Sequence, residues 1–216
     1  MRKYKTKVEI IYEVLKESII TGIYKPGDRI TIAQVAKDNE VSEIPVRESL
    51  RMLESEGLID IKPNIGPVVS IISEEDILEQ FEIRGVLEGY ATRQSIDNLE
   101  ESDLLELESI VGKMKAAIEE QDFQEYGELN RMFHSYIHES CGNLILSNMI
   151  TDLLNRWERN RSVFYLAPQR SKESLEEHYR IIELIKEKKG KEVEEFVRIH
   201  KQKSALKLIE YLKQNK

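Results

Sequence analysis

The sequence predicts a mostly α-helical protein in two parts: a small N-terminal module of three helices and a β-hairpin, and a larger antiparallel bundle of six helices. Both strong β-strand signals and four of the five prolines lie before residue 73, whereas the later chain has an almost continuous helical period. Residues 1–72 carry 11 Lys or Arg and 11 Asp or Glu, so the later residues account for the whole net charge of −8. We therefore expect two domains, residues 1–72 and 73–216.

Composition and charge exclude several classes of protein. The chain is 40% hydrophobic and 33% charged, which is typical of globular domains and argues against a wholly disordered or collagen-like chain. No apolar run approaches the roughly 20 residues that span a bilayer, and the basic start leads into no apolar stretch with a cleavage site. The single cysteine, Cys141, cannot form an internal disulfide. We therefore expect a cytoplasmic protein without membrane association, and its net negative charge argues against non-specific coating of nucleic acid.

The first two helices are marked by apolar spacing and by a capping signal. Val8, Ile11, Leu15 and Ile19 recur at steps of three and four residues, which predicts an amphipathic helix that ends near Gly22. A turn at residues 25–28 follows. Residues 31–34, with Thr first and Gln last, then predict a capping box at the start of a short second helix.

A third helix and a β-hairpin complete the module. Ser42 is a good N-cap for a helix that runs to about Glu56, and Gly57 ends this helix. Two short strands are expected at residues 59–61 and 68–71, joined by a turn at residues 63–67. This order of elements predicts a winged helix-turn-helix. It also fits a three-helix interaction domain whose arginines are ordinary surface residues.

A winged helix-turn-helix would place the start of its third helix in the major groove of DNA. The exposed side chains there would contact bases, a residue one turn later would reach phosphate, and the hairpin would lie along the backbone or the minor groove. The predicted DNA-binding residues are Ser42, Glu43, Ile44, Arg47, Arg51, Lys62 and Asn64.

Three segments of this module resemble the winged helix of the GntR family of bacterial transcription regulators. They are PGDRI, SEIPVRESLRMLESEGLI and PNIGPVVS, and the resemblance covers residues 8–72. It implies binding to an operator in double-stranded DNA. Ala33, Glu43 and Ile65 stand where the family commonly has arginine. Arginine and lysine provide most phosphate affinity and the commonest guanine contact, so these departures bear on operator sequence and affinity and not on the fold.

The second part is expected to form a bundle of six helices. Ser73 and Asp76 predict a capping box before its first helix, whereas Asp122 caps the third helix and Gly142 closes it. Bundles of this kind house ligands or metals in their cores, or serve for dimerisation alone. The predicted helices span residues 73–98, 101–120, 122–141, 144–166, 172–189 and 191–214.

All four histidines lie in this second part, and three of them fall on or beside the inward faces of different helices. His134 follows Asn130 by four residues, so both project from one face, and His178 and His200 continue the apolar stripes of two later helices. One such histidine alone is more often a hydrogen-bonded core residue. Three imidazoles and one oxygen donor, however, suit zinc or another first-row divalent metal. His138 is a competing candidate, although a surface residue or a support for a ligand is its more ordinary interpretation.

Four segments of the second part resemble the FCD ligand-binding domain of the FadR subfamily of GntR regulators. They are FEIRGVLEGYAT, NRMFHSYIHESCGN, LEEHYRII and VRIHKQK; the resemblance covers residues 73–216, with six helices as in the VanR-type branch. In metal-containing members an Asp or Asn and three His bind the ion, which implies Asn130, His134, His178 and His200 here. Zinc is the expected metal, with nickel or manganese as alternatives. Asn130 replaces the commoner Asp, and the lost negative charge should weaken divalent-ion binding.

Arg84 lies at the edge of the apolar face of the first bundle helix. Spacing alone predicts that it extends to solvent or pairs with Glu88. The FCD resemblance instead implies that an arginine of this motif lies at the effector pocket. A guanidinium beside a metal would bind a carboxylate from two sides, so the expected effector is a small organic acid. Arg156, Arg159 and Arg161 are further candidates for this pocket.

The two resemblances together imply a ligand-responsive transcription regulator, a homodimer that reads a near-palindromic operator and acts as a repressor. Two rival hypotheses remain open. A metal-dependent hydrolase on the bundle would need a general base, and the sequence contains no HExxH motif. A degenerate regulator that lacks metal or sequence-specific DNA binding would fit the residues found at positions 33, 43, 65 and 130.

Overall fold

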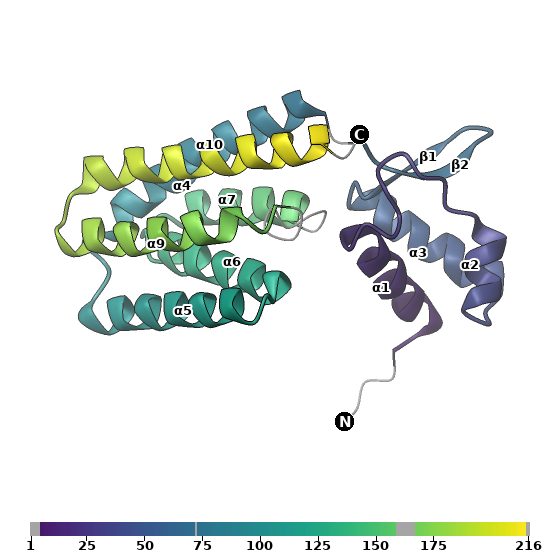
Figure 1. Cartoon of the computed structure of the whole chain (residues 1–216), viewed down its shortest axis with the longest axis horizontal. Coiled ribbons are helices and arrows are strands. Elements are labelled where there is room, and N and C mark those ends of the chain that lie inside the picture. Colours follow the sequence, from purple (N-terminus) through teal and green to yellow (C-terminus); the bar gives the residue numbers. More distant parts are fainter. Residues whose placement is uncertain (1–4, 72, 159–166, 215–216) are drawn as a thin grey trace. The chain divides into compact units, whose positions relative to one another are not determined.

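The structure, a computed structural model, describes residues 5–71, 73–158 and 167–214. The chain divides into two compact units, and one boundary between them falls after residue 72. Within the described residues the chain is mostly helical with one two-stranded sheet, as the sequence predicts (Figure 1).

The first unit contains three helices and a hairpin: α1 (Lys7–Ile20), α2 (Ile32–Asp38), α3 (Glu43–Ser55), β1 (Ile59–Lys62) and β2 (Gly66–Val69). The two strands pair antiparallel, with Ile59 opposite Val69 and Lys62 opposite Gly66. One apolar core connects all of these elements and leaves the start of α3 and the tip of the hairpin exposed. This is the arrangement of a winged helix-turn-helix.

Two details of this unit differ from the prediction. Thr31 and Ser42 precede α2 and α3, but neither side chain makes a capping hydrogen bond. Gln34, the expected reciprocal partner of Thr31, donates to Asp38 at 2.6 Å, so α2 has no capping box. The second strand also begins two residues earlier than expected. The hairpin turns more tightly than predicted, because Asn64 adopts a left-handed φ of 62° and Ile65 donates its backbone N–H to the carbonyl of Lys62.

The second unit is all-helical and contains α4 (Glu74–Ser95), α5 (Glu101–Glu119), α6 (Phe123–Glu139), α7 (Leu144–Glu158), α9 (Arg170–Lys186) and α10 (Gly190–Gln214). The predicted capping box at the start of α4 is present, since Ser73 accepts from the backbone of Asp76 and Asp76 accepts from the backbone of Ser73. Asp122 caps α6 through the backbone N–H of Glu125. The predicted helix at residues 144–166 is found as α7, and its expected last part, residues 159–166, lies outside the described residues.

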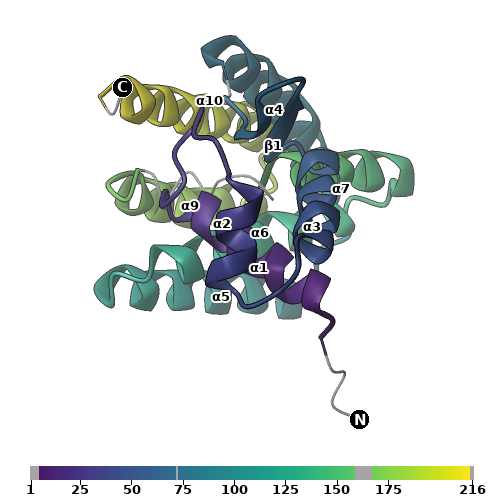
Figure 2. The ribbon, with the colours of Figure 1, turned by 90° about the vertical axis from the view of Figure 1, so that its right-hand side faces the viewer.

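Helices α4 and α10 lie side by side and form the most extensive helix pair of the unit (Figures 1 and 2). Glycine permits this close approach. A Cβ atom on Gly89 would lie 2.6 Å from the backbone oxygen of Glu194, and one on Gly85 would lie 3.3–3.4 Å from atoms of Arg198. The tight packing brings the inward side chains of α4 against those of α10.

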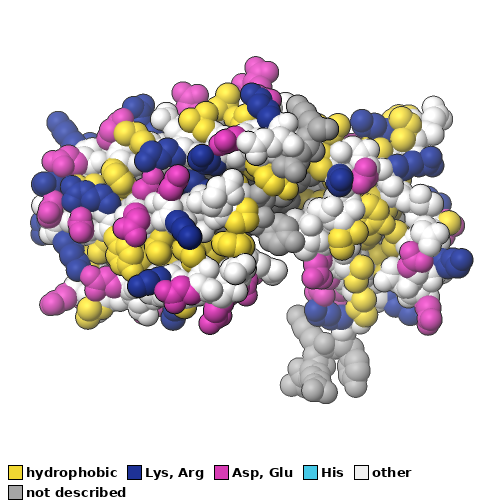
Figure 3. Space-filling model, viewed as in Figure 1, with side chains coloured by type: hydrophobic (Ala, Val, Ile, Leu, Met, Phe, Trp, Pro, Cys, Tyr) yellow, Lys and Arg dark blue, Asp and Glu magenta, His cyan; other side chains and the backbone are white. Residues whose placement is uncertain are grey.

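The bundle core is built mainly from α5, α6, α9 and α10 and contains Phe133, Ile181 and Val197 among its fully buried side chains. The surface carries charges of both signs, and no histidine is visible on the face drawn in Figure 3. The four histidines instead lie inside the unit, each at most 2% exposed.

Candidate metal and effector site

Three histidines from three helices converge in the interior of the second unit. His134 comes from α6, His178 from α9 and His200 from α10, and they form one candidate metal-binding group. The ring centroids lie 5.2 Å apart for His134 and His178, 5.3 Å for His134 and His200, and 5.1 Å for His178 and His200. Sequence reasoning placed these residues on inward faces, and the packing of the helices brings their rings together.

The spacing of the imidazole nitrogens fits a tetrahedral metal ion. The Nε2 atoms of His134 and His178 are 3.3 Å apart. Two nitrogens bound tetrahedrally to zinc, each at about 2.0–2.1 Å, would be separated by about 3.3 Å. The donor atoms of all three histidines lie within 4.8 Å of one another. The group therefore has the dimensions of a site for a small divalent cation.

Asn130 supplies a buried oxygen on the same face of α6 as His134, one turn earlier. Its side chain is 8% exposed, and its Oδ1 atom has no hydrogen-bond partner among the described residues. Buried carbonyl oxygens are rarely left without a partner, so this atom is available to a bound cation. The residues present thus fit a metal ion with three nitrogen donors and one oxygen donor.

Burial also sets the protonation state of the imidazoles. It is the largest cause that lowers the pKa of His134 and His178 well below 6.5, and the charge of Lys201 lowers both further. Burial likewise lowers the pKa of His200 to about 4, although the hydrogen bond that its ring makes to the Glu177 carboxylate raises it. Neutral imidazoles are the form that binds metals, so the three rings are ready to coordinate at neutral pH.

His138 is not a surface residue. It is 2% exposed, and burial lowers its pKa to about 4. Together with His134 and Glu88 it forms a second candidate group, in which its Nε2 atom lies 3.6 Å from a carboxylate oxygen of Glu88. The interpretation of His138 as a surface residue was therefore wrong, because α6 turns this position toward α4.

Arg84 makes the ion pair that helical spacing predicts. Its Nε atom donates to Glu88 at 2.8 Å, and the residue is 5% exposed. Lys201 of α10 approaches the other carboxylate oxygen of Glu88 at 2.5 Å. Burial alone would raise the pKa of Glu88, but the charges of Lys201 and Arg84 hold it well below its usual value. Arg84 and Lys201 are thus both held by one ionised carboxylate in the interior.

A second carboxylate contacts the histidine group at His200. Glu177 of α9 is 2.7 Å from the Nδ1 atom of His200, and it also accepts from Arg170 and from Lys203. Burial would raise the pKa of Glu177, but these hydrogen bonds, that of His200 foremost, hold it at about 2. Arg170 is fully buried and also donates to the backbone oxygen of His200.

Sequence reasoning did not identify Lys201, Glu177 or Arg170 as residues of the site. Each had a signal: Lys201 follows His200 directly, Glu177 precedes His178, and Arg170 lies eight residues before His178 on the same helical stripe. Charged residues are seldom fully buried, and such positions are normally read as solvated. Arg159 and Arg161, two of the further candidates for the effector pocket, lie outside the described residues, as does the side chain of Arg156.

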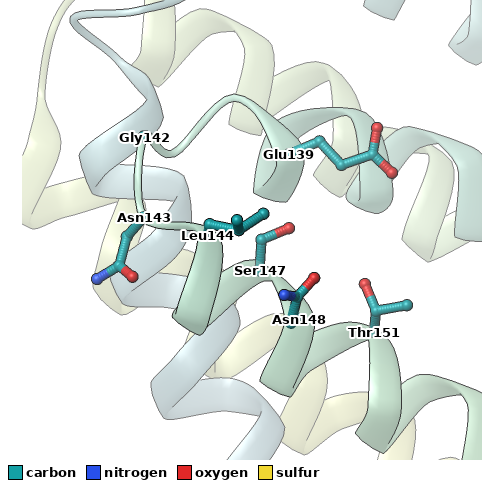
Figure 4. Close-up of a pocket in the computed structure, with 7 residues that line it drawn as sticks. All are labelled: Glu139, Gly142, Asn143, Leu144, Ser147, Asn148 and Thr151. Atoms are coloured by element: carbon teal, nitrogen blue, oxygen red, sulfur yellow. The ribbon is translucent and has the colours of Figure 1, made fainter.

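A surface pocket of about 520 Å³ lies where α6 ends and α7 begins (Figure 4). It is lined by Glu139 and by residues of the α7 start, including Ser147 and Thr151. None of its lining residues belongs to the histidine group, so it is separate from the candidate site.

The predicted DNA-binding residues are all exposed. Ser42, Glu43, Ile44 and Arg47 lie at the start of α3, Arg51 lies one turn after Arg47, and Lys62 and Asn64 lie at the hairpin. Arg47 is paired with Glu43 at 2.8 Å, a contact within one helix between two exposed side chains. The charge of Arg47 is therefore partly neutralised within α3. In the part of the chain that the structure describes, no helix is both long enough and apolar enough to cross a membrane.

Two family models match the chain. Residues 7–69 match the family described as bacterial regulatory proteins, gntR family, and residues 79–203 match the FCD domain. The uncharacterized HTH-type transcriptional regulator YdhC of Bacillus subtilis is 31% identical over 190 residues, which cover 88% of this chain and 85% of that protein. The gluconate operon transcriptional repressor of the same organism is 33% identical over 90 residues, 42% of this chain and 36% of that protein.

Solved structures share the fold of this chain. Escherichia coli McbR/YncC aligns with a TM-score of 0.70 at 25% identity, over 96% of this chain and 99% of that one. A putative GntR transcriptional regulator from Rhodococcus sp. RHA1 also aligns with a TM-score of 0.70, at 20% identity, over 95% and 98% of the two chains. The second likeness bears on the fold alone.

Proposed function

We propose that this chain, a member of the GntR family of bacterial transcription regulators with an FCD domain, is a repressor. A carboxylate bound at a metal ion would control it. In this proposal residues 1–72 bind DNA, and residues 73–216 bind the effector and dimerise. The observation that carries it is the convergence of three buried histidines from α6, α9 and α10.

The metal would be held by Asn130, His134, His178 and His200. Zinc suits this donor set, and nickel or manganese are alternatives. When bound, the ion would supply positive charge that attracts a carboxylate, whose oxygen would be an additional ligand beyond the four protein donors. The protein's part is to hold neutral imidazoles in place and to keep water away from them, which their burial achieves.

Arg84 would bind the effector beside the metal. In the structure its guanidinium donates to Glu88, so an effector carboxylate would share Arg84 with Glu88 or displace Glu88 from it. Guanidinium binds carboxylates in a planar, two-point geometry, which favours a small organic acid as effector.

The DNA partner would be a near-palindromic operator read by a homodimer, because the two-fold symmetry of a dimer is mirrored in its operator. Exposed apolar side chains on the outer face of α4, Ile83, Val86 and Tyr90, are available for a dimer contact. Repression is proposed by analogy with the name of the gluconate operon repressor. A coupling of about 1–3 kcal/mol between effector and operator would change DNA affinity about 5- to 150-fold.

The first test is metal content measured by elemental analysis on protein purified without added metal or chelator. The proposal predicts about one divalent ion per chain. His178→Asn should lose the ion, because His178 belongs only to the three-histidine group. The matched control, His138→Asn, alters an equally buried histidine of the second group and should keep it. Wild-type protein that takes up no zinc, nickel or manganese would refute the metal site. Loss of the ion in His138→Asn alone would instead assign the metal to the second candidate group, which contains Glu88.

The second test measures operator binding. Protein with metal should bind one duplex far better than a scrambled duplex, and a bound carboxylate should change that affinity. Equal binding to any duplex would favour the rival hypothesis of a degenerate regulator. The observation that supports this rival is the exposed Glu43, which neutralises Arg47.

A further inference from the structure

Glu177 is in an unusual position for an acidic residue. It is 7% exposed, and it precedes His178 in the sequence but contacts a different histidine. Its Oε2 atom lies 2.7 Å from the Nδ1 atom of His200, on the neighbouring helix α10. The two residues are 23 positions apart, so the packing of α9 against α10 creates this contact.

The contact favours one tautomer of His200. An ionised carboxylate is only an acceptor, so this 2.7 Å contact, which is shorter than the 3.3 Å contact of the same Nδ1 with Arg170 Nη2, favours the tautomer with its proton on Nδ1. The lone pair of a neutral ring then resides on Nε2, which is the nitrogen that remains for a metal ion. Metal-binding histidines commonly donate their second N–H to a carboxylate, which orients the ring and raises its basicity.

Arg170 holds the carboxylate in place. Its Nη2 atom donates to the same Oε2 atom of Glu177 and lies 3.3 Å from the backbone oxygen of His200. Lys203 occupies the other carboxylate oxygen at 2.8 Å. Arg170 thus contacts both the backbone of His200 and the carboxylate that binds its ring, and this leaves the ring little freedom to turn.

We propose that Glu177 is a positioning residue for the metal ligand His200, and that Arg170 fixes Glu177 in that role. This inference rests on the metal site proposed above. It adds that the affinity for the ion depends on a carboxylate that does not itself touch the ion.

The test uses Glu177→Gln in the full chain, with Glu176→Gln as its matched control. Glu176 is the preceding residue on the same helix and is exposed, so the same chemical change there leaves His200 untouched. Two quantities are measured: zinc affinity by competition with a chelator, and the His200 tautomer in metal-free protein by long-range ¹H–¹⁵N NMR.

Glu177→Gln should bind zinc about 10- to 100-fold more weakly than wild type, the range found when such supporting carboxylates are removed. Its metal-free His200 should lose the single Nδ1–H tautomer that we expect in wild type. Glu176→Gln should match wild type in both measurements. Unchanged affinity or an unchanged tautomer in Glu177→Gln would overturn the proposal, even if the variant were less stable.

Two further outcomes are separable. If Glu177→Gln does not fold, Glu177→Asp is used instead. This variant keeps the negative charge that pairs with Arg170, but its side chain is one methylene shorter, so the carboxylate lies further from His200. It should also weaken zinc binding, by a smaller factor. If wild-type protein itself binds no metal, the metal site fails and this proposal with it. If wild-type protein binds zinc and Glu177→Gln binds it with the same affinity, only the role of Glu177 is refuted.

Discussion

Removal of the Glu88 carboxylate should destabilise the second unit strongly. Glu88 is fully buried and lies between two cations from different helices, with Arg84 Nε at 2.8 Å and Lys201 Nζ at 2.5 Å. Glu88→Gln keeps the size of the side chain and removes its charge. Arg84 and Lys201 then remain in the interior without this carboxylate, and a buried cation that loses its counter-charge is costly.

The magnitude follows from measured cases of broken buried pairs, which cost about 3–5 kcal/mol. In a chain of this size 1 kcal/mol corresponds to about 2–4 °C in melting temperature, so a decrease of about 6–20 °C is expected. Lys201→Met in the same chain removes one of the two cations. The double variant Glu88→Gln/Lys201→Met should therefore recover about half of the loss.

The assay is thermal and urea unfolding of metal-free protein followed by circular dichroism. Glu194→Gln is the control, because its ion pair with Arg93 is partly exposed to solvent and exposed pairs contribute about 0–1 kcal/mol. A Glu88→Gln variant as stable as the Glu194→Gln control would refute the reasoning. A double variant less stable than Glu88→Gln alone would show that Lys201 is not held by Glu88.

Three other predictions are independent of this one. Metal-free protein should lose stability as the pH falls below about 6.5, because the low pKa values keep the buried histidines neutral in the folded state while the unfolded chain takes up protons. The free energy of unfolding should fall by up to about 1.4 kcal/mol per histidine per pH unit. Urea midpoints that stay constant between pH 7.5 and 5.5 would contradict this prediction. Arg47→Ala should weaken operator binding and reduce its salt dependence, whereas Glu43→Gln should strengthen binding by releasing Arg47; equal affinities in a fluorescence titration would remove this pair from the interface. Gly89→Ala should destabilise the α4–α10 pair, since its Cβ atom would meet the backbone of Glu194. Gly112→Ala has open space around it, so it should be neutral or stabilising by up to about 1 kcal/mol. Equal melting temperatures for the two variants would disprove the close packing of α4 against α10.

The elements of the fold could largely be predicted from the sequence, because their signals are local. The apolar period of α1 and the Ser73–Asp76 capping box are set by residues within one turn of each other. The same local reasoning was wrong for Thr31, because Gln34 had a competing partner in Asp38. A capping box depends on which of two nearby hydrogen bonds is stronger, and residue types alone do not decide this.

The candidate site could be predicted in part. Helical spacing assigned the histidines to inward faces, but the 3.3 Å separation of the His134 and His178 nitrogens depends on how α6 and α9 pack. The pairing of Glu88 with Lys201 joins residues from opposite ends of the second unit's sequence. Such contacts leave no periodic signal, and a lone charged residue on a helix looks the same in sequence whether it is solvated or buried. Whether the site binds metal stays a prediction.

The depth of the histidine group has a kinetic consequence. His178 is fully enclosed, and His134 and His200 are 2% exposed, so an ion or an acid can reach them only while neighbouring helices have moved apart. The entry rate is then set by how often the bundle opens, and the departure rate by the same event. An occupant captured in this way would have a long residence time. A regulator with such a slow exchange responds to a sustained change in its surroundings and averages out brief fluctuations.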